Sequence, residues 1–256
     1  MANTLVNISA LPETDDLEAR RLSKEFEERE PQELLRWAIE RYGDQLALAT
    51  SFQADGMVLL DMAWRISPDI KVITVDSGRL PQETYDVIDQ VRERYNLSIN
   101  VFSPQAEALQ QFVRENGSNP FYRSLELRVA CCDVRKVAPL TRALKGYSAW
   151  ITGQRRDQNT TRRSVNVVER DIAHGGILKL NPLANWNHEQ VWDYIRQHDV
   201  PYNALYDQGF TSIGCAPCTR ATRPGEDPRS GRWWWETDLP KECGIHCAID
   251  WNSLRA

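Results

Sequence analysis

Four of the six cysteines fall into two tight pairs, Cys131-Cys132 and Cys215-Ala-Pro-Cys218. Neighbouring cysteines make a poor intramolecular disulfide, because the ring that they would close is strained. Two adjacent thiolates and two from a Cys-x-x-Cys turn can instead hold four corners of one inorganic core. Four thiolates suit a cubic iron–sulfur cluster better than one tetrahedral zinc ion. A zinc site with the same ligands and a set of buried free thiols remain open as alternatives.

Bulk properties narrow the class of protein. The formal charge of −5 over 256 residues argues against a nucleic-acid binder. The first residues lack the basic and apolar regions of a secretory signal, and the apolar run Met57–Leu60 is interrupted at Asp61, so no membrane span is expected. A chain that is not secreted keeps its thiols reduced, which favours metal binding or catalysis over disulfides. The expected compartment is the cytoplasm.

The apolar pattern predicts an α/β fold. Strands are expected at Leu46–Thr50, Ile70–Val75, Ser98–Phe102 and Ala149–Thr152, and helices at 57–66, 81–95, 105–115 and around Cys131. Alternating strands and helices imply a mainly parallel sheet covered on both faces, whose ligands bind beyond the carboxyl ends of the strands. Three segments are expected to divide the chain: a helical arm (1–30), a nucleotide-binding domain (31–205), and a cluster-binding and catalytic flap (206–256).

Polar and basic residues gather at the expected strand ends. Segments starting at Thr50, Val75 and Thr152 are rich in hydroxyls, glycine or charge, as an anion site requires, although Ser and Thr also serve as helix caps. Guanidinium groups match phosphate and sulfate oxygens in bidentate geometry. Solvated surface charge explains a single arginine better than it explains two groups. The two groups are Arg155, Arg156, Arg162 and Arg163 after one strand, and Arg220, Arg223, Arg229 and Arg232 after Cys218.

The tail Lys241-Glu-Cys-Gly-Ile-His-Cys247 carries the remaining thiols. A mobile thiol at Cys243 suits a nucleophile that must approach a bound substrate and later meet a protein reductant. The cations Lys241 and His246 could raise its thiolate fraction. The alternative is a frayed end with two incidental thiols. Cys247 could form a disulfide with Cys243 or have no role, and the second interpretation is favoured.

Together these residues resemble the assimilatory adenylyl-sulfate and phosphoadenylyl-sulfate reductases. The resemblance extends from about residue 45 to 246 and rests on several motifs at once. The matching stretches are Val75-Asp-Ser-Gly-Arg-Leu-Pro-Gln-Glu-Thr-Tyr85, Cys131-Cys-Asp-Val-Arg-Lys136, Thr152-Gly-Gln-Arg-Arg-Asp-Gln158, Gly214-Cys-Ala-Pro-Cys-Thr-Arg220, Gly231-Arg-Trp-Trp-Trp-Glu236 and Lys241-Glu-Cys-Gly-Ile-His246.

The resemblance implies an adenine nucleotide α-hydrolase-like fold and a reaction. Cys243 would attack the sulfur of adenosine 5′-phosphosulfate, AMP would leave, and thioredoxin or glutaredoxin would release sulfite from the S-sulfocysteine. Cys131, Cys132, Cys215 and Cys218 would bind a four-iron, four-sulfur (4Fe-4S) cluster, which tunes the field around Lys136 and the sulfate. The candidate substrate contacts are Ser51, Ser77, Gly78, Arg79, Lys136, Gly153, Arg155, Arg162, Arg163, Arg229, Arg232 and His246.

Several points stay open at this stage. The cluster cysteines favour adenosine 5′-phosphosulfate over its 3′-phosphorylated form, but a 3′-phosphate or dual specificity is an alternative. The loop at Ser51-Phe-Gln departs from the Ser-Gly-Gly of some relatives, and Arg162 and Arg163 compete for one role. A cluster-containing nucleotide hydrolase acting on RNA would need a pyrophosphate loop that this chain lacks. A zinc-stabilised binding module and a homo-oligomeric assembly are also open.

Overall fold

The computed structural model describes residues 13–236 and 241–245. Eight α-helices and six strands are present in this part of the chain. The helices are α1 (Glu13–Phe26), α2 (Pro31–Tyr42), α3 (Ala54–Ile66), α4 (Gln82–Tyr95), α5 (Ala106–Asn116), α6 (Leu125–Cys132), α7 (Ala138–Leu144) and α8 (His188–His198). The strands are β1 (Leu46–Ala49), β2 (Lys71–Val75), β3 (Ile99–Phe102), β4 (Ala149–Ile151), β5 (Val168–Asp171) and β6 (Ile177–Leu180).

The strands form one sheet in the order β3-β2-β1-β4-β6-β5. All neighbours pair in parallel except β5 and β6, which form an antiparallel hairpin at one edge. The prediction of a mainly parallel α/β sheet is confirmed. The four strands expected from the apolar pattern are present within a residue of their predicted ends. The β5–β6 hairpin and α8 were not predicted, and the division into three segments stays a prediction.

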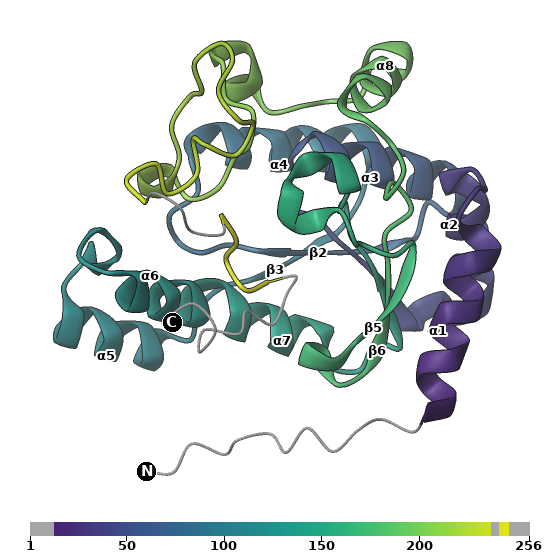
Figure 1. The fold of residues 1–256 in the computed structure, drawn as a ribbon, viewed down its shortest axis with the longest axis horizontal. Coiled ribbons are helices and arrows are strands. Elements are labelled where there is room, and N and C mark those ends of the chain that lie inside the picture. The colour runs from purple at the N-terminus through teal and green to yellow at the C-terminus, as the bar shows by residue number, and fades with distance from the viewer. Residues whose placement is uncertain (1–12, 237–240, 246–256) are drawn as a thin grey trace.

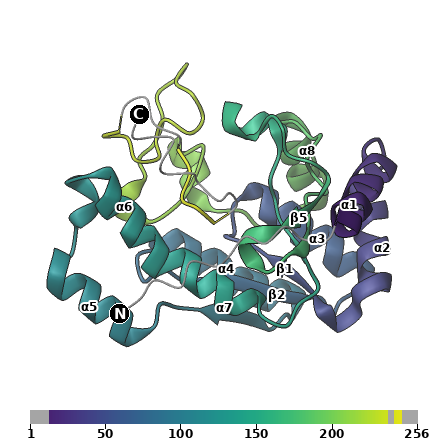
Figure 2. The same ribbon diagram turned by 60° about the horizontal axis from the view of Figure 1, so that its bottom comes forward.

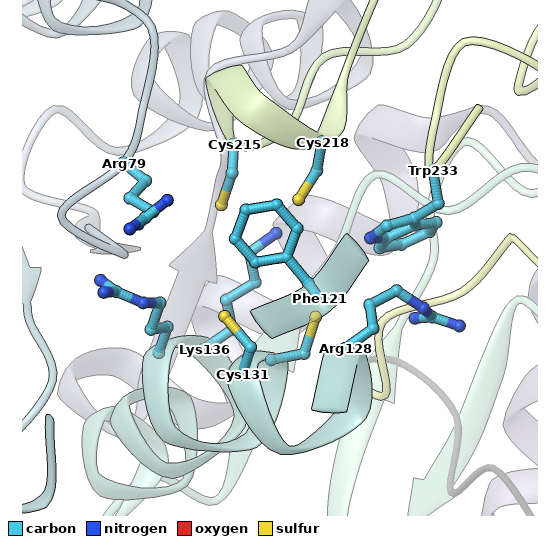
Figure 3. A pocket seen from close by; sticks show the side chains of 10 residues that line it. Arg79, Phe121, Arg128, Cys131, Lys136, Cys215, Cys218 and Trp233 are labelled. Atoms are coloured by element: carbon cyan, nitrogen blue, oxygen red, sulfur yellow. The ribbon is translucent and has the colours of Figure 1, made fainter. Parts of the chain in front are cut away.

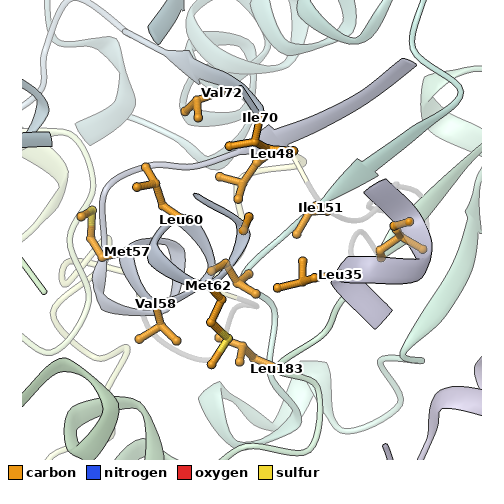
Figure 4. Close-up of a cluster of buried hydrophobic side chains, with 14 of the residues drawn as sticks. Leu35, Leu48, Met57, Val58, Leu60, Met62, Ile70, Val72, Ile151 and Leu183 are labelled. Atoms are coloured by element: carbon orange, nitrogen blue, oxygen red, sulfur yellow. The ribbon is translucent and has the colours of Figure 1, made fainter. Parts of the chain in front are cut away.

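Helices cover both faces of the sheet, as Figures 1 and 2 show. Side chains alternate along each strand, so Leu48 of β1 faces one layer and its neighbour Ala47 faces the other. The larger core lies under α2, α3, α4 and α8, and part of it is drawn in Figure 4. The smaller core packs Trp150 of β4 and Ile73 of β2 against α7. None of the helices among the described residues is long and apolar enough to cross a bilayer.

A buried carboxylate ties three helices of the larger core together. Asp61 of α3 is fully buried and accepts hydrogen bonds from Tyr95 of α4 (3.0 Å) and Tyr194 of α8 (2.7 Å). Arg65, one turn further along α3, donates to the same carboxylate at 2.7 Å. Because an unpaired buried charge is costly, this set of donors fixes how α4 and α8 lie on α3.

The N-terminal helix α1 packs beside β5 at the antiparallel edge of the sheet. Two ion pairs join this end of the chain to the α/β body: Arg170 of β5 to Glu18 of α1 (3.0 Å), and Arg156 to Glu27 just after α1 (2.5 Å). Phe26 is buried and its ring lies 5.4 Å from that of Trp37 on α2. The residues expected to form a peripheral helical arm therefore include a helix that contacts the body.

Candidate active site

The carboxyl ends of β1, β2 and β4 meet at one edge of the sheet, and a large cavity of about 440 Å³ opens there. This volume is in the range of pockets that hold small ligands. The polar strand-end segments therefore come together as the sequence predicted. Eight of the predicted site residues line the cavity: Ser51, Lys136, Gly153, Arg155, Arg162, Arg229, Arg232 and Cys243.

The loop after β1 brings the start of α3 to the cavity. Phe52 is buried in a left-handed conformation (φ 56°), and its amide donates to the hydroxyl of Thr50 at 3.0 Å. Gly153, at the end of β4, lies against this turn, since a Cβ placed on it would be 3.0 Å from the Cβ of Asp55 and 3.2 Å from the nitrogen of Gly56. A larger residue at 153 would push the two strand ends apart.

Arg155 is held in place by two carboxylates. It is 5% exposed and pairs with Asp55 at 2.5 Å and with Asp157 at 2.9 Å. Burial opposes its charge, but the two carboxylates outweigh burial and raise its pKa. Gln158 also donates to Asp55, at 2.8 Å. The sequence identified the arginine but not its acidic partners: Asp55 lies 100 positions away in the chain, and no pattern marked Asp157, two positions away, as a partner.

A second, smaller pocket adjoins the cavity and collects the paired cysteines. Cys131, Cys132, Cys215 and Cys218 are all buried and line it together, with Lys136 shared between the two pockets. The first pair ends α6, and the second flanks a short 3₁₀ turn, Ala216–Cys218, with Cys215 just before it and Cys218 at its end. Figure 3 shows the labelled thiols of these two elements directed toward one space, with the Lys136 ammonium between them. The fold thus brings the two pairs to one pocket, and their binding of a cluster stays a prediction.

The surroundings of this thiol pocket are strongly cationic. Arg79, Arg128, Arg135 and Lys136 all line it. Burial raises the pKa of the Cys132 and Cys218 thiols to about 12 each. Burial would also raise the pKa of Cys215, but the Lys136 ammonium and the Ser77 hydroxyl, 3.1 Å from the sulfur, outweigh it and lower that pKa. The pocket therefore favours negative charge on sulfur most strongly at Cys215.

Several predicted substrate contacts lie beside the thiols and do not line the cavity. Ser77 approaches Cys215, and Arg79 lines the thiol pocket. A Cβ placed on Gly78 would lie 3.6 Å from Nη1 of Arg135. Arg163 is exposed, whereas its neighbour Arg162 is buried at the cavity. The structure thus separates the two arginines that the sequence left in competition. His246 and Cys247 lie outside the described residues.

The segment Lys241–Ile245 contributes Cys243 and Ile245 to the lining of the cavity, and Cys243 also packs against the cluster of buried cysteines and Trp233. Gly244 follows in a left-handed conformation (φ 84°), a turn that favours glycine. The Lys241 ammonium donates to the carbonyls of Trp233 (2.7 Å) and Glu236 (2.6 Å). Lys136 is therefore an alternative to Lys241 as the cation that activates Cys243. Burial would lower the pKa of Lys136, but the negative charges of Cys215, Cys243 and Cys132 outweigh burial and raise it.

A π-helical turn, Asp133–Val137, links the cysteine pair on α6 to α7. Such wide turns are rare in helices, and those that occur are often found at functional sites. This one carries Arg135, whose side chain donates to the carbonyl of Ser77 at 2.7 Å, and Lys136. The turn was not predicted from the sequence, because its apolar spacing is that of an ordinary helix.

Among the described residues, no group of three or more His, Cys, Asp or Glu side chains has the arrangement of a metal site. What the four thiols share is the pocket that they all line. Two residues that line this pocket carry a buried donor with no acceptor among the described residues: Trp233 at its indole nitrogen and Arg135 at Nε.

Comparison with known proteins places the whole arrangement in a family. A model of the phosphoadenosine phosphosulfate reductase domain matches residues 45–221. An adenosine 5′-phosphosulfate reductase of Burkholderia cepacia is 49% identical over 203 residues, which are 79% of this chain and 81% of the relative. The enzyme of that name from Pseudomonas aeruginosa is 46% identical over 230 residues, 88% of this chain and 85% of the relative.

Solved structures agree with the fold. A phosphoadenylyl-sulfate reductase from Candida auris, in a phosphate complex, superposes with a TM-score of 0.70 at 32% identity and covers 82% of this chain and 98% of that one. A Candida glabrata FMN adenylyltransferase, at 15% identity and a TM-score of 0.54, covers 97% of this chain and 85% of its own, and shares the fold alone. On the match over residues 45–221 and these identities, the chain belongs to the phosphoadenosine phosphosulfate reductase domain family.

Proposed function

We propose that this protein reduces adenosine 5′-phosphosulfate to sulfite and AMP in the assimilation of sulfate. The names of its bacterial relatives support this substrate. The observation that carries the proposal is the placement of Cys243. Cys243 is half-buried and lines a cavity that is rich in cations, and it packs against the four buried thiols without lining the pocket that they share.

In the proposed reaction the Cys243 thiolate attacks the sulfur of the sulfate group. An S–S bond forms as the bond between that sulfur and the bridging phosphate oxygen breaks, so AMP leaves with the electron pair and the enzyme holds a Cys–S–SO₃⁻ adduct. A reductant thiolate then attacks Sγ of Cys243 and expels sulfite. Its second thiol resolves the mixed disulfide, which restores Cys243 and leaves an oxidised dithiol. The reductant provides both electrons.

The residues present fit a 4Fe-4S cluster held by Cys131, Cys132, Cys215 and Cys218. The support is the shared pocket, the donor chemistry of four thiols, and the two buried N–H groups of Trp233 and Arg135 that could meet sulfur. When bound, such a group supplies a fixed negative field beside Lys136. Lys136 lies in both pockets and can turn its ammonium toward the sulfate oxygens, where charge shifts as the S–O bond breaks.

The phosphorylated substrate, 3′-phosphoadenosine 5′-phosphosulfate, is the second candidate. Its support is the name and 32% identity of the Candida auris structure, against identities near 46–49% for the relatives named for the unphosphorylated substrate. We favour the unphosphorylated form on this difference. Thioredoxin is the proposed reductant and glutaredoxin its alternative. The cytoplasm is the proposed compartment because the tail thiol and the four buried thiols all need reducing conditions.

The test is a parallel assay of both sulfonucleotides with protein purified without oxygen. Iron and acid-labile sulfide are measured first, then sulfite and AMP release with reduced thioredoxin or glutaredoxin. We expect about four irons per chain, sulfite from adenosine 5′-phosphosulfate, and no turnover in Cys243→Ser with its iron content unchanged. Full sulfite release by Cys243→Ser would refute the proposal. Zinc in place of iron would refute the cluster assignment, and faster turnover of the 3′-phosphorylated form would reverse the preference.

A further inference from the structure

Glu242, the residue before Cys243, is buried with an exposed fraction of 5%. Its carboxylate meets Arg162 in a bidentate pair: Nε to Oε1 at 2.9 Å and Nη2 to Oε2 at 2.8 Å. Thr161 donates to Oε1 at 3.3 Å, and Arg229 approaches Oε2 at 3.4 Å. The residue beside the nucleophile is therefore attached to two segments, one after β4 and one after Cys218.

The backbone at this point is held as well. Arg128 of α6 donates to the carbonyl of Glu242 at 2.9 Å, and Arg229 donates to the carbonyl of Lys241. Arg128 is in turn buried against Glu236, at 2.7 Å, and against the ring of Trp233. The peptide that leads into Cys243 is thus fixed from several sides, while Gly244 allows the chain to turn away directly after it.

The Arg162 guanidinium is occupied by the chain itself. Burial would raise the pKa of Glu242, but the hydrogen bonds from Arg162 and the charge of Arg229 outweigh it and lower that pKa, so the carboxylate is charged at neutral pH. A guanidinium that donates two parallel N–H bonds to a carboxylate does not have that edge available for a second anion. Arg232 differs, since its Nη1 donates to the neutral Ser212 hydroxyl (3.3 Å) and Ile213 carbonyl (3.1 Å).

We propose that Arg162 is the receptor for the tail, and that Glu242 is the positioning residue that brings Cys243 to the cavity. Arg162 then does not bind the substrate anion. That task falls to Lys136 and Arg232, whose side chains line the same cavity. The inference about docking concerns the tail alone. Its effect on turnover rests on the proposed function.

The first experiment needs no substrate. The rate of Cys243 alkylation by iodoacetamide is followed by peptide mass in a Cys247→Ser background, for Glu242→Gln, Arg162→Gln and the double variant. If the pair docks the tail, each single change should raise the rate about tenfold or more, as loss of a buried charged hydrogen bond allows. The double variant should lie close to the singles, because both act through one contact.

The matched control is Glu27→Gln, which alters another bidentate arginine pair, with Arg156 at 2.5 and 3.1 Å, that does not involve the tail. It should leave the alkylation rate unchanged. Alkylation of Glu242→Gln and Arg162→Gln at the unaltered rate overturns the proposal. Additive effects in the double variant overturn it too, because two independent roles would then be needed.

The second experiment separates the tail receptor from a substrate contact. For adenosine 5′-phosphosulfate, Arg162→Gln and Glu242→Gln should lower kcat by similar factors with little change in KM, whereas Arg232→Gln should raise KM. If Arg162→Gln raises KM as Arg232→Gln does and Glu242→Gln does not, Arg162 is a substrate ligand and the proposal is wrong. If no variant and not even the unaltered protein turns over, the proposed function fails while the alkylation result still decides the docking.

Discussion

Arg128 is expected to hold the C-terminal segment onto the sheet domain, and replacing it tests this. Its guanidinium is 1% exposed and faces the Glu236 carboxylate, itself 7% exposed, at 2.7 Å. Arg128→Met removes the cation, leaves that carboxylate buried, and loses the bond to the Glu242 carbonyl. Breaking one side of a buried ion pair costs about 3–5 kcal/mol. At 1.36 kcal/mol for each factor of ten, this predicts that opening of the segment becomes roughly a hundred to several thousand times more frequent.

The assay is hydrogen exchange read by peptide, which reports local opening. Peptides from 212–236 should exchange faster in Arg128→Met, while those of β1 should not change. The double variant Arg128→Met/Glu236→Met should recover most of the protection, because a buried pair replaced on both sides by apolar groups is often neutral or better. Arg142→Met, on the exposed side of α7, is the control. Equal exchange in β1 and 212–236, or no recovery in the double variant, would contradict this account of Arg128.

Three further outcomes are expected. The hydrogen bonds from Arg162 outweigh burial and lower the pKa of Glu242 in the fold, so its stabilising effect is complete above about pH 4.5 and is lost as pH falls through the folded pKa. The difference in thermal midpoint between the unaltered protein and Glu242→Gln should therefore shrink as the pH falls below about 4.5. Arg163→Ala should leave KM within about twofold, since this side chain is exposed, and a larger change would return it to the site. Asp61→Ala should lower the free energy of unfolding by about 3–5 kcal/mol in urea titration, because two buried tyrosine hydroxyls lose their acceptor, and a loss below about 1 kcal/mol would show that they find other partners.

The sequence predicted what depends on local periodicity. Strands such as Leu46–Ala49 and Lys71–Val75 are predicted by apolar runs between turn residues, and the parallel sheet follows from their alternation with helices. The hairpin of β5 and β6 was missed because its two short strands carry charged residues such as Arg170 and Lys179, which dilute the apolar signal. The union of the two cysteine pairs was predicted from ligand chemistry, not from periodicity.

The site was predicted less completely than the fold. Cationic residues were found because arginines cluster in the chain, yet their partners were not, since Glu242 and Arg162 lie 80 positions apart and no spacing rule relates them. The same holds for Arg155 with Asp55. Which arginine of a neighbouring pair points inward depends on the conformation of a loop, and composition carries no information on that choice. Sequence reasoning therefore found the charges of the site without finding which of them are already neutralised.

Because of the wide turn at Asp133–Val137, the position of the Lys136 side chain depends on the number of residues in this helix. Deleting one residue inside it would let the backbone relax into an uninterrupted α-helix, since the extra residue is what opens the turn. The helix beyond the turn would keep its place, because the wide turn is what absorbs the extra residue, but the side chains inside the turn would be redistributed around the helix axis. Lys136 would leave the border between the two pockets although both cysteines before it kept their places. Insertions and deletions at this point should therefore be tolerated far less than substitutions, and a homologue with a different count of residues between its cysteine pair and its lysine would need another cation there.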